Sequence, residues 1–236
     1  LDRIEQQGDW IVMGAGVTFR QIKDSSLLKR HARLLSEAAA TVGALQIQTV
    51  ATLAGNVVNA MPAADGSVAL VALDAEAEIA SQQGRTWRSV LELFRGPGES
   101  AVDPSREVLT AIRFPVPGPR HGSAWERIGR RKALVLPILN CAVSITLEAD
   151  FRTIDQARIG LGPVAPIPFR ARETEAFLVG RPADKETFIQ AAEIAAGEAQ
   201  PRSSLLRASK EYRIEVLKVL VRQGLIRAVA QAQGVS

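Results

Sequence analysis

A proline- and glycine-rich stretch, PVPGPRHG at residues 115–122, divides this chain of 236 residues into two unlike parts. Proline fixes the backbone angle φ and has no N–H to donate, so neither a helix nor a central strand continues through such a stretch. A chain of this length is long enough to form two packed units. We therefore predict one unit over residues 1–116 and a second unit over residues 122–236.

The part before this connector mixes short strands and short helices. Apolar segments bounded by turn residues predict strands, and segments with helical spacing or a capping residue such as Thr18 predict helices. The run at residues 44–65 loses the helical period, so we predict mostly an ordered loop with a short helical turn. The predicted strands cover 9–16, 75–80, 86–88 and 108–114, and the predicted helices cover 18–22, 34–42, 67–73 and a turn at 90–94.

The part after the connector separates its strands from its helices. Three strands are predicted first, over residues 123–130, 138–148 and 157–162, and then helices over 171–178, 184–199 and 208–230. The last helix places five apolar side chains on one face. These are Ile214, Leu217, Val221, Leu225 and Ala228. Strands followed by helices predict a three-stranded antiparallel sheet covered by helices, and the whole chain is assigned to the α+β class.

Composition excludes several classes of function. The net charge is +4, but the basic residues are scattered or form short groups such as residues 130–132, and aromatic residues make up only 5%. This pattern does not favour nucleic-acid binding. No apolar run is long enough to cross a bilayer, so we expect a cytoplasmic protein without membrane insertion. The one cysteine, Cys141, lies in the apolar run 137–147 and is expected to be a buried, inert thiol, and two isolated histidines predict no metal site.

The sequence contains no recognisable set of catalytic side chains. Residues 14–16 read Gly-Ala-Gly after a strand, but a dinucleotide-binding fingerprint needs a further glycine where this chain has Phe19. A tight turn from strand to helix is the better interpretation. The carboxylates of Glu173 and Glu175 are typical of a solvated helix face. Since no catalytic residue is predicted, a cofactor is expected to supply any chemistry.

The most informative stretch is TVATLAGNVVNAMPAAD at residues 49–65. Its small residues allow the backbone to approach a ligand closely, and Thr52, Asn56 and Asn59 add hydroxyl and amide groups. Backbone N–H groups in such a turn can hold a pyrophosphate. Asp65 could accept hydrogen bonds from ribose hydroxyls or cap the next helix. From these features alone, a loop that cradles an anion and a structural loop packed between layers are equally compatible.

This stretch resembles the second flavin-binding loop of the FAD subunits of xanthine dehydrogenase and aerobic carbon monoxide dehydrogenase. That family carries Thr/Ser-x-Gly-Gly-Asn, an alanine-rich segment and then Pro-x-x-Asp. This chain has Thr52-Leu53-Ala54-Gly55-Asn56 and then Pro62-Ala63-Ala64-Asp65, with Ala54 in place of one family glycine. Similar segments follow the family in order along nearly the whole chain, at residues 9–18, 35–48, 70–78, 96–115, 123–131 and 209–213.

The resemblance implies a PCMH-type second FAD-binding subdomain, followed by a unit like the C-terminal part of the carbon monoxide dehydrogenase flavoprotein. It implies that residues 52–56 contact the pyrophosphate and ribityl region of FAD. Further implied contacts are Asn59, Asp65, Leu109, Arg127 and Val42. Arg127 stands about where the family often has a lysine close to the flavin. For Leu109 and Val42, a role in the ordinary core is equally compatible with the sequence.

The resemblance also implies a role in electron transfer. Partner subunits would hold the molybdopterin centre and two [2Fe–2S] clusters, and electrons would pass through FAD to NAD⁺, a quinone or oxygen. Family members begin with a smaller subdomain carrying a glycine-rich loop, and without that segment we expect this chain alone to bind FAD weakly or not at all. Two alternatives stay open: a cofactor-free assembly or binding module that kept the fold, and a stand-alone FAD-dependent oxidase of the vanillyl-alcohol-oxidase type.

Overall fold

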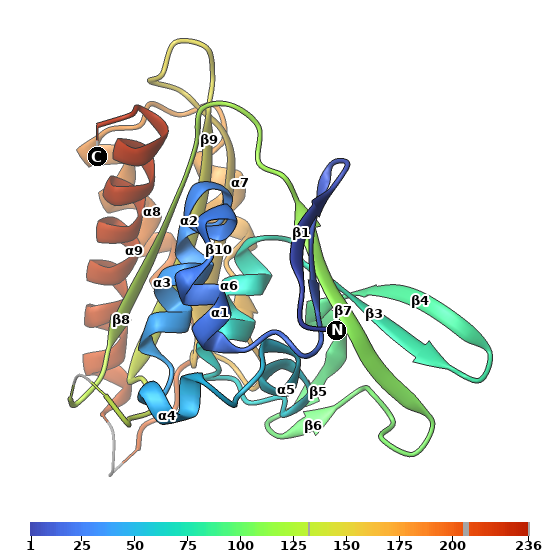
Figure 1. Cartoon of the computed structure of the whole chain (residues 1–236). Coiled ribbons are helices and arrows are strands. Elements are labelled where there is room, and N and C mark those ends of the chain that lie inside the picture. The colour runs from blue at the N-terminus through green and yellow to red at the C-terminus, as the bar shows by residue number, and fades with distance from the viewer. Residues whose placement is uncertain (132, 205–207, 236) are drawn as a thin grey trace.

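The computed structural model describes residues 1–131, 133–204 and 208–235, which leaves Lys132 of the basic group at 130–132 outside the described residues. Figure 1 shows a layered α+β arrangement, as predicted, in which helices lie between two antiparallel sheets and two long helices cover the outside of one of them. One sheet has five strands in the order β1-β2-β7-β3-β4, and the other has four in the order β11-β10-β9-β8.

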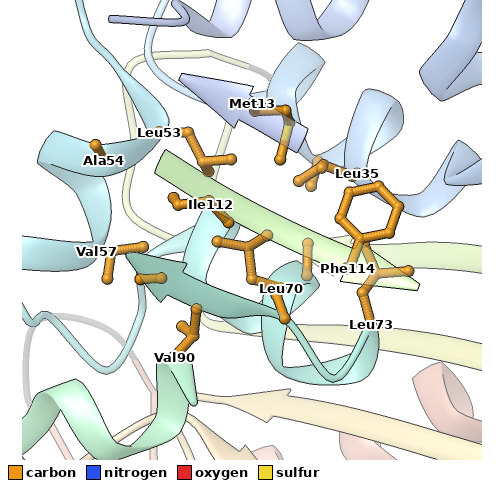
Figure 2. Packing of buried hydrophobic residues seen from close by; sticks show 14 of the residues in the cluster. Met13, Leu35, Leu53, Ala54, Val57, Leu70, Leu73, Val90, Ile112 and Phe114 are labelled. Atoms are coloured by element: carbon orange, nitrogen blue, oxygen red, sulfur yellow. The ribbon is translucent and has the colours of Figure 1, made fainter. Parts of the chain in front are cut away.

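The five-stranded sheet is built from residues before the end of the proline-rich connector. Its strands are β1 (Ile4–Gln7), β2 (Trp10–Gly14), β7 (Glu107–Pro115), β3 (Glu76–Ser81) and β4 (Gly84–Ser89). Side chains alternate between the two faces, and Figure 2 shows Met13, Ile112 and Phe114 pointing into the core beside Leu35 and Leu70. A small hairpin of β5 (Phe94–Gly96) and β6 (Glu99–Ser100) turns at Pro97 and Gly98.

The helices of this part begin where short polar side chains cap them. Thr18 accepts a hydrogen bond from the Gln21 amide and forms a capping box at α1 (Phe19–Asp24), so the predicted cap is confirmed. The prediction of mostly loop at 44–65 is wrong, because this run holds two short helices of four and six residues. Too few turns are present there for a helical period to show in the sequence. The remaining elements are α2 (Ser26–His31), α3 (Arg33–Thr41), α4 (Leu45–Gln48), α5 (Leu53–Val58), α6 (Asp65–Ala72) and the 3₁₀ turn η1 (Val90–Leu93).

The second sheet contains the three predicted strands and one more. These strands are β8 (His121–Ile128), β9 (Leu139–Leu147) and β10 (Ile154–Gly162), and the two-residue β11 (Phe169–Arg170) extends the edge. Helices α3 and α6 pack on one face, and α8 (Lys185–Glu198) and α9 (Lys210–Ala232) lie on the outer side, with α7 (Arg172–Leu178) against β10 and α8. On the predicted face of α9, four side chains are fully buried and Ile214 is half-buried.

Ion pairs join residues before the connector to residues after it. Asp74, which follows α6, binds both Arg158 on β10 and Arg170 on β11, and Arg158 Nε lies 2.6 Å from Asp74 Oδ2. Burial opposes ionisation of Asp74, but the two arginines outweigh it and hold the pKa below its usual value. Arg170 also binds Glu175, which is buried and accepts a hydrogen bond from the Ile159 amide. The prediction of a solvated Glu175 is therefore wrong.

Arg227 on α9 makes a second set of ion pairs, one of which crosses the connector. Arg227 lies 2.8 Å from Glu37 on α3 and 2.7 Å from Glu126 on β8, and it also donates to the Trp125 carbonyl. A guanidinium can hold several acceptors at once because its donors form a rigid fork. The inner helices, the second sheet and the outer helix are therefore tied together by one side chain.

Cys141 is fully buried in β9, and burial, with a smaller contribution from Glu126, raises the pKa of its thiol above the usual range. We expect the native chain not to react with iodoacetamide. The reacting species is the thiolate, whereas this thiol stays protonated and its sulfur is buried. Mass spectrometry after timed labelling would check this, with the chain unfolded in denaturant as the positive control. Fast, stoichiometric labelling of the folded chain would contradict it.

Candidate functional site

The stretch singled out in the sequence forms the start of a helix. Thr52 is the N-cap of α5, and its Oγ1 accepts a hydrogen bond from the Gly55 amide at 3.0 Å. The Leu53 amide donates to the Val17 carbonyl at 3.1 Å. Among the described residues, the Ala54 amide has no acceptor. The small side chains here leave room for an acceptor group to reach this helix start.

The two asparagines of the stretch differ in their surroundings. Asn56 Oδ1 accepts hydrogen bonds from the amide of Ser67 at 3.1 Å and from its hydroxyl at 3.4 Å, so this side chain ties α5 to α6. Gly66 permits this close packing, because a Cβ there would come within 2.8 Å of Asn56 Oδ1. Asn59 is exposed at the C-terminal end of α5. It has no side-chain hydrogen bond in the described part of the chain.

Asp65 is the centre of a buried polar cluster. It is the first residue of α6 and makes no capping hydrogen bond, so the capping alternative is wrong. Its carboxylate accepts from Asn140 Nδ2 at 2.7 Å, and both its oxygens lie 3.3 Å from Arg127 Nε. The side chains of Asp65 and Arg127 are only 7% and 8% exposed. The fold therefore joins two of the predicted site residues in a nearly water-free ion pair.

Burial raises the pKa of the Asp65 carboxyl, and this effect exceeds the opposing influence of the Arg127 charge and of hydrogen bonds from Asn140 and Arg127. Arg127 is held on its other side as well, since its Nη2 donates to the Val135 carbonyl at 2.5 Å. The guanidinium therefore links α6 to the loop that joins β8 to β9.

The other two predicted site residues, Leu109 and Val42, make no hydrogen bond to this cluster in the described part of the chain. Leu109 on β7 is buried in the hydrophobic core, and α5 packs against the same strand. Val42 is half-buried at the C-terminal end of α3, and its carbonyl accepts from Gln48 Nε2 at 2.9 Å. The Oε1 atom of Gln48 is buried and has no donor within the described residues.

Sequence reasoning missed Asn140. Its side chain is fully buried in β9, directly paired with Arg127 on β8 and with Gly162 on β10. Its Oδ1 atom has no hydrogen-bond partner in the described part of the chain. The signal was present in the sequence, because an asparagine inside the apolar run 137–147 needs a polar partner if that run is a central strand.

A groove of about 880 Å³ opens beside the segment that leads to Asp65. Its walls include Met61, Pro62, Ala63, Leu136 and the 163–166 loop. Cofactors and small molecules commonly occupy spaces of this size. The described residues contain no group of three or more metal-ligating side chains, and none of the helices is long and apolar enough to span a membrane. The arrangement can bind a ligand that carries hydroxyl groups and negative charge.

Two family models match this chain. The one described as the FAD binding domain in molybdopterin dehydrogenase matches residues 1–117. The one described as the CO dehydrogenase flavoprotein C-terminal domain matches residues 125–228. The two matches follow each other without overlap and leave the end of the connector between them.

Curated proteins and solved structures agree with these models. The chain is 31% identical to the xanthine dehydrogenase FAD-binding subunit of Escherichia coli O157:H7, over 94% of this chain and 75% of the relative. It is 30% identical to the carbon monoxide dehydrogenase medium chain of Afipia carboxidovorans, over 98% and 78%. The structure of carbon monoxide dehydrogenase from Hydrogenophaga pseudoflava matches with a TM-score of 0.91 at 26% identity, covering 97% of this chain and 78% of that one.

Proposed function

Because this chain belongs to the FAD-binding subunits of molybdopterin dehydrogenases of the xanthine and carbon monoxide dehydrogenase type, we propose that it passes electrons from iron–sulfur clusters of a partner subunit through FAD to an acceptor. The observation that carries this proposal is the buried cluster of Asp65, Arg127 and Asn140 beside the capped start of α5. We further propose that residues 1–116 and 122–236 form the two units of the subunit.

The residues present fit FAD on three counts. The Ala54 amide lacks a partner among the described residues, the Asp65 carboxylate can accept from a sugar hydroxyl, and the adjoining groove has the volume of a cofactor site. Residues Thr52 to Asn56 would hold the phosphate and ribityl region, and Asp65 and Asn59 would bind further along. Bound FAD would supply the ability to accept electrons from one carrier and deliver them to another.

The positive charge of Arg127 would influence which oxidation state of the bound cofactor is favoured. A cation held in a nearly dry environment stabilises nearby negative charge more strongly than it could in water. Here the guanidinium is fixed by Asp65 and by the Val135 carbonyl. Arg127 would therefore favour the reduced, anionic form of the cofactor. Leu109 and Val42 would contribute apolar surface where the cofactor meets the core.

The iron–sulfur clusters of the proposed chain of carriers belong in another subunit. A [2Fe–2S] cluster is held by four ligands, usually cysteine thiolates, and this sequence has one cysteine, which is buried. We propose a small subunit with [2Fe–2S] clusters and a large molybdopterin-binding subunit as partners. NAD⁺, a quinone or oxygen would be the acceptor.

Reconstitution with candidate partner subunits tests this function. The assembled complex, supplied with the substrate of the large subunit or with a chemical reductant, is expected to lose the visible absorbance of its flavin and to regain it when an acceptor is added. A complex that assembles without flavin would instead support the assembly module. Flavin reduction by a substrate in the absence of all partners would support the stand-alone oxidase.

A matched pair of substitutions tests the site itself. We expect Asp65→Asn to weaken FAD binding by roughly tenfold or more, the effect of losing a hydrogen bond to a charged acceptor. Asp74→Asn is the control, since Asp74 lies at the other end of α6 and also binds arginines. Titration of FAD by fluorescence, with each variant reconstituted with its partner subunits, would give both affinities. Equal losses in the two variants would show that Asp65 acts only through general stability.

A further inference from the structure

Asn140 occupies a place where a polar side chain is costly. Every residue of β9 except Thr146 is buried, and Asn140 has no exposed surface. A buried amide destabilises the fold unless its polar atoms are hydrogen-bonded. An apolar residue of similar volume would avoid this cost. The presence of asparagine at this position therefore indicates that the amide group itself has a function.

The orientation of the amide follows from its neighbours. One end lies 2.7 Å from Asp65 Oδ1 and 3.4 Å from the Ala63 carbonyl oxygen. Both of these atoms are acceptors, so this end must be the NH₂ group. The other end, Oδ1, faces Gly162, where an added Cβ would come within 2.7 Å. It has no donor among the described residues. Asn140 thus satisfies Asp65 while one of its own atoms stays unsatisfied.

The hydrogen bonds at Asp65 leave part of its carboxylate available. A carboxylate has about four acceptor positions. Asn140 takes one on Oδ1, and the single N–H of Arg127 Nε lies at equal distance from both oxygens. The amide of Asn140 is neutral and rigidly placed in the sheet, so it fixes the rotation of the carboxylate without adding charge.

We propose that Asn140 is a positioning residue for FAD: it holds the Asp65 carboxylate in the rotation that presents a free acceptor position to a sugar hydroxyl of the cofactor. This inference rests on the proposed function, because it presumes that Asp65 binds FAD. The charged groups facing the amide are Asp65 on α6 and Arg127 on β8. No other ionisable side chain forms a hydrogen bond with it within the described residues.

Two substitutions in the full chain test the proposal, with FAD affinity measured across pH. Asn140→Leu removes the donor and keeps the branched shape of the side chain, and we expect FAD to bind roughly tenfold more weakly at every pH. Asn140→Asp places two carboxylates together, which cannot both ionise at low cost. We expect this variant to bind FAD weakly in alkaline solution and to recover towards the wild type as the pH falls, when a shared proton restores a donor.

Ser144→Ala is the matched control for the loss of a buried hydrogen bond in the same strand. Ser144 is buried, and its hydroxyl bonds His121 at 2.9 Å near the far end of β9. Thermal unfolding without FAD would record the stability of each variant. Wild-type FAD affinity in Asn140→Leu, or an Asn140→Asp variant whose FAD affinity does not recover at lower pH, would overturn the role of Asn140. The proposed function would still stand. A wild-type chain that binds no FAD, alone or with its partners, would overturn the proposed function.

Discussion

Arg127→Met is expected to lower the free energy of unfolding by about 3–5 kcal/mol, the usual cost of removing one partner from a buried ion pair. Methionine keeps most of the apolar stem of the side chain and removes the charged guanidinium. The Asp65 carboxylate, only 7% exposed, would lose its counter-charge and keep the Asn140 amide as its main partner. The loss should therefore come mainly from an uncompensated buried charge.

The destabilisation caused by Arg127→Met should depend on pH, in a direction set by the protonation of the Asp65 carboxyl. Burial already raises its pKa above 3.8 in the native chain, and removing Arg127 takes away the main opposing charge and raises it further. A carboxyl whose pKa is raised on folding favours the folded state when protonated, and this contribution is lost as the pH rises through the folded-state pKa. The destabilisation is thus expected to be largest at neutral pH and to shrink as the pH falls towards 3.8.

Urea unfolding of the wild type and the variant at a series of pH values would measure this difference. Arg85→Met is the matched control, because Arg85 pairs with Glu78 at 2.9 Å while its own side chain is 65% exposed. Exposed pairs contribute about 0–1 kcal/mol. A deficit in Arg127→Met that stays constant with pH would mean that the lost packing of the side chain, and not the charge of Asp65, is responsible.

Gly122→Ala is expected to destabilise the chain by on the order of 3 kcal/mol, the upper end for overpacking a core. Gly122 lies in β8 under α9, and an added Cβ would come within 1.9 Å of the Ala228 carbonyl oxygen and 2.6 Å of the Ala232 amide nitrogen. Both are backbone atoms, so the strain cannot be relieved by a side-chain rotation. The last turns of α9 would have to lift from the sheet.

The same substitution elsewhere in the chain should have the opposite sign. Gly197 is exposed in α8, and an added Cβ there meets nothing within 4 Å. Replacing a glycine within a helix by alanine stabilises it by up to about 1 kcal/mol. Thermal unfolding of both variants would show the contrast. A Gly122→Ala chain as stable as the wild type would contradict the close packing of α9 on β8.

Elements that carry their own local signals were predictable from the sequence. Thr18 and the apolar face of α9 identify their helices without reference to the rest of the fold. Strand β1 gives no such signal, because three of its four residues are exposed and its order comes from pairing with β2. Strand β11 consists of two residues and depends in the same way on its neighbour β10.

The residues of the site also divide into those with a local sequence signal and those that depend on the rest of the fold. The stretch from Thr52 to Asp65 is contiguous, so it could be found by its resemblance to a family. The pairing of Asp65 with its partners could not. Arg127, which the resemblance implied as a site residue, and Asn140, which it did not, lie 62 and 75 residues further along the chain. Their meeting depends on the register of β8 with β9 and on the packing of α6 against that sheet. Neither the register nor the packing can be read from a local pattern.

The side chains that meet across the connector also constrain how genes of this kind can recombine. Asp65 and Asp74 come from one side of it, and Arg127, Asn140, Arg158 and Arg170 come from the other. A crossover at residues 115–122 between two diverged copies would bring together halves whose buried charges had not been matched to each other. Although this connector separates the two proposed units, the paired side chains favour inheritance of both units together from the same parent gene.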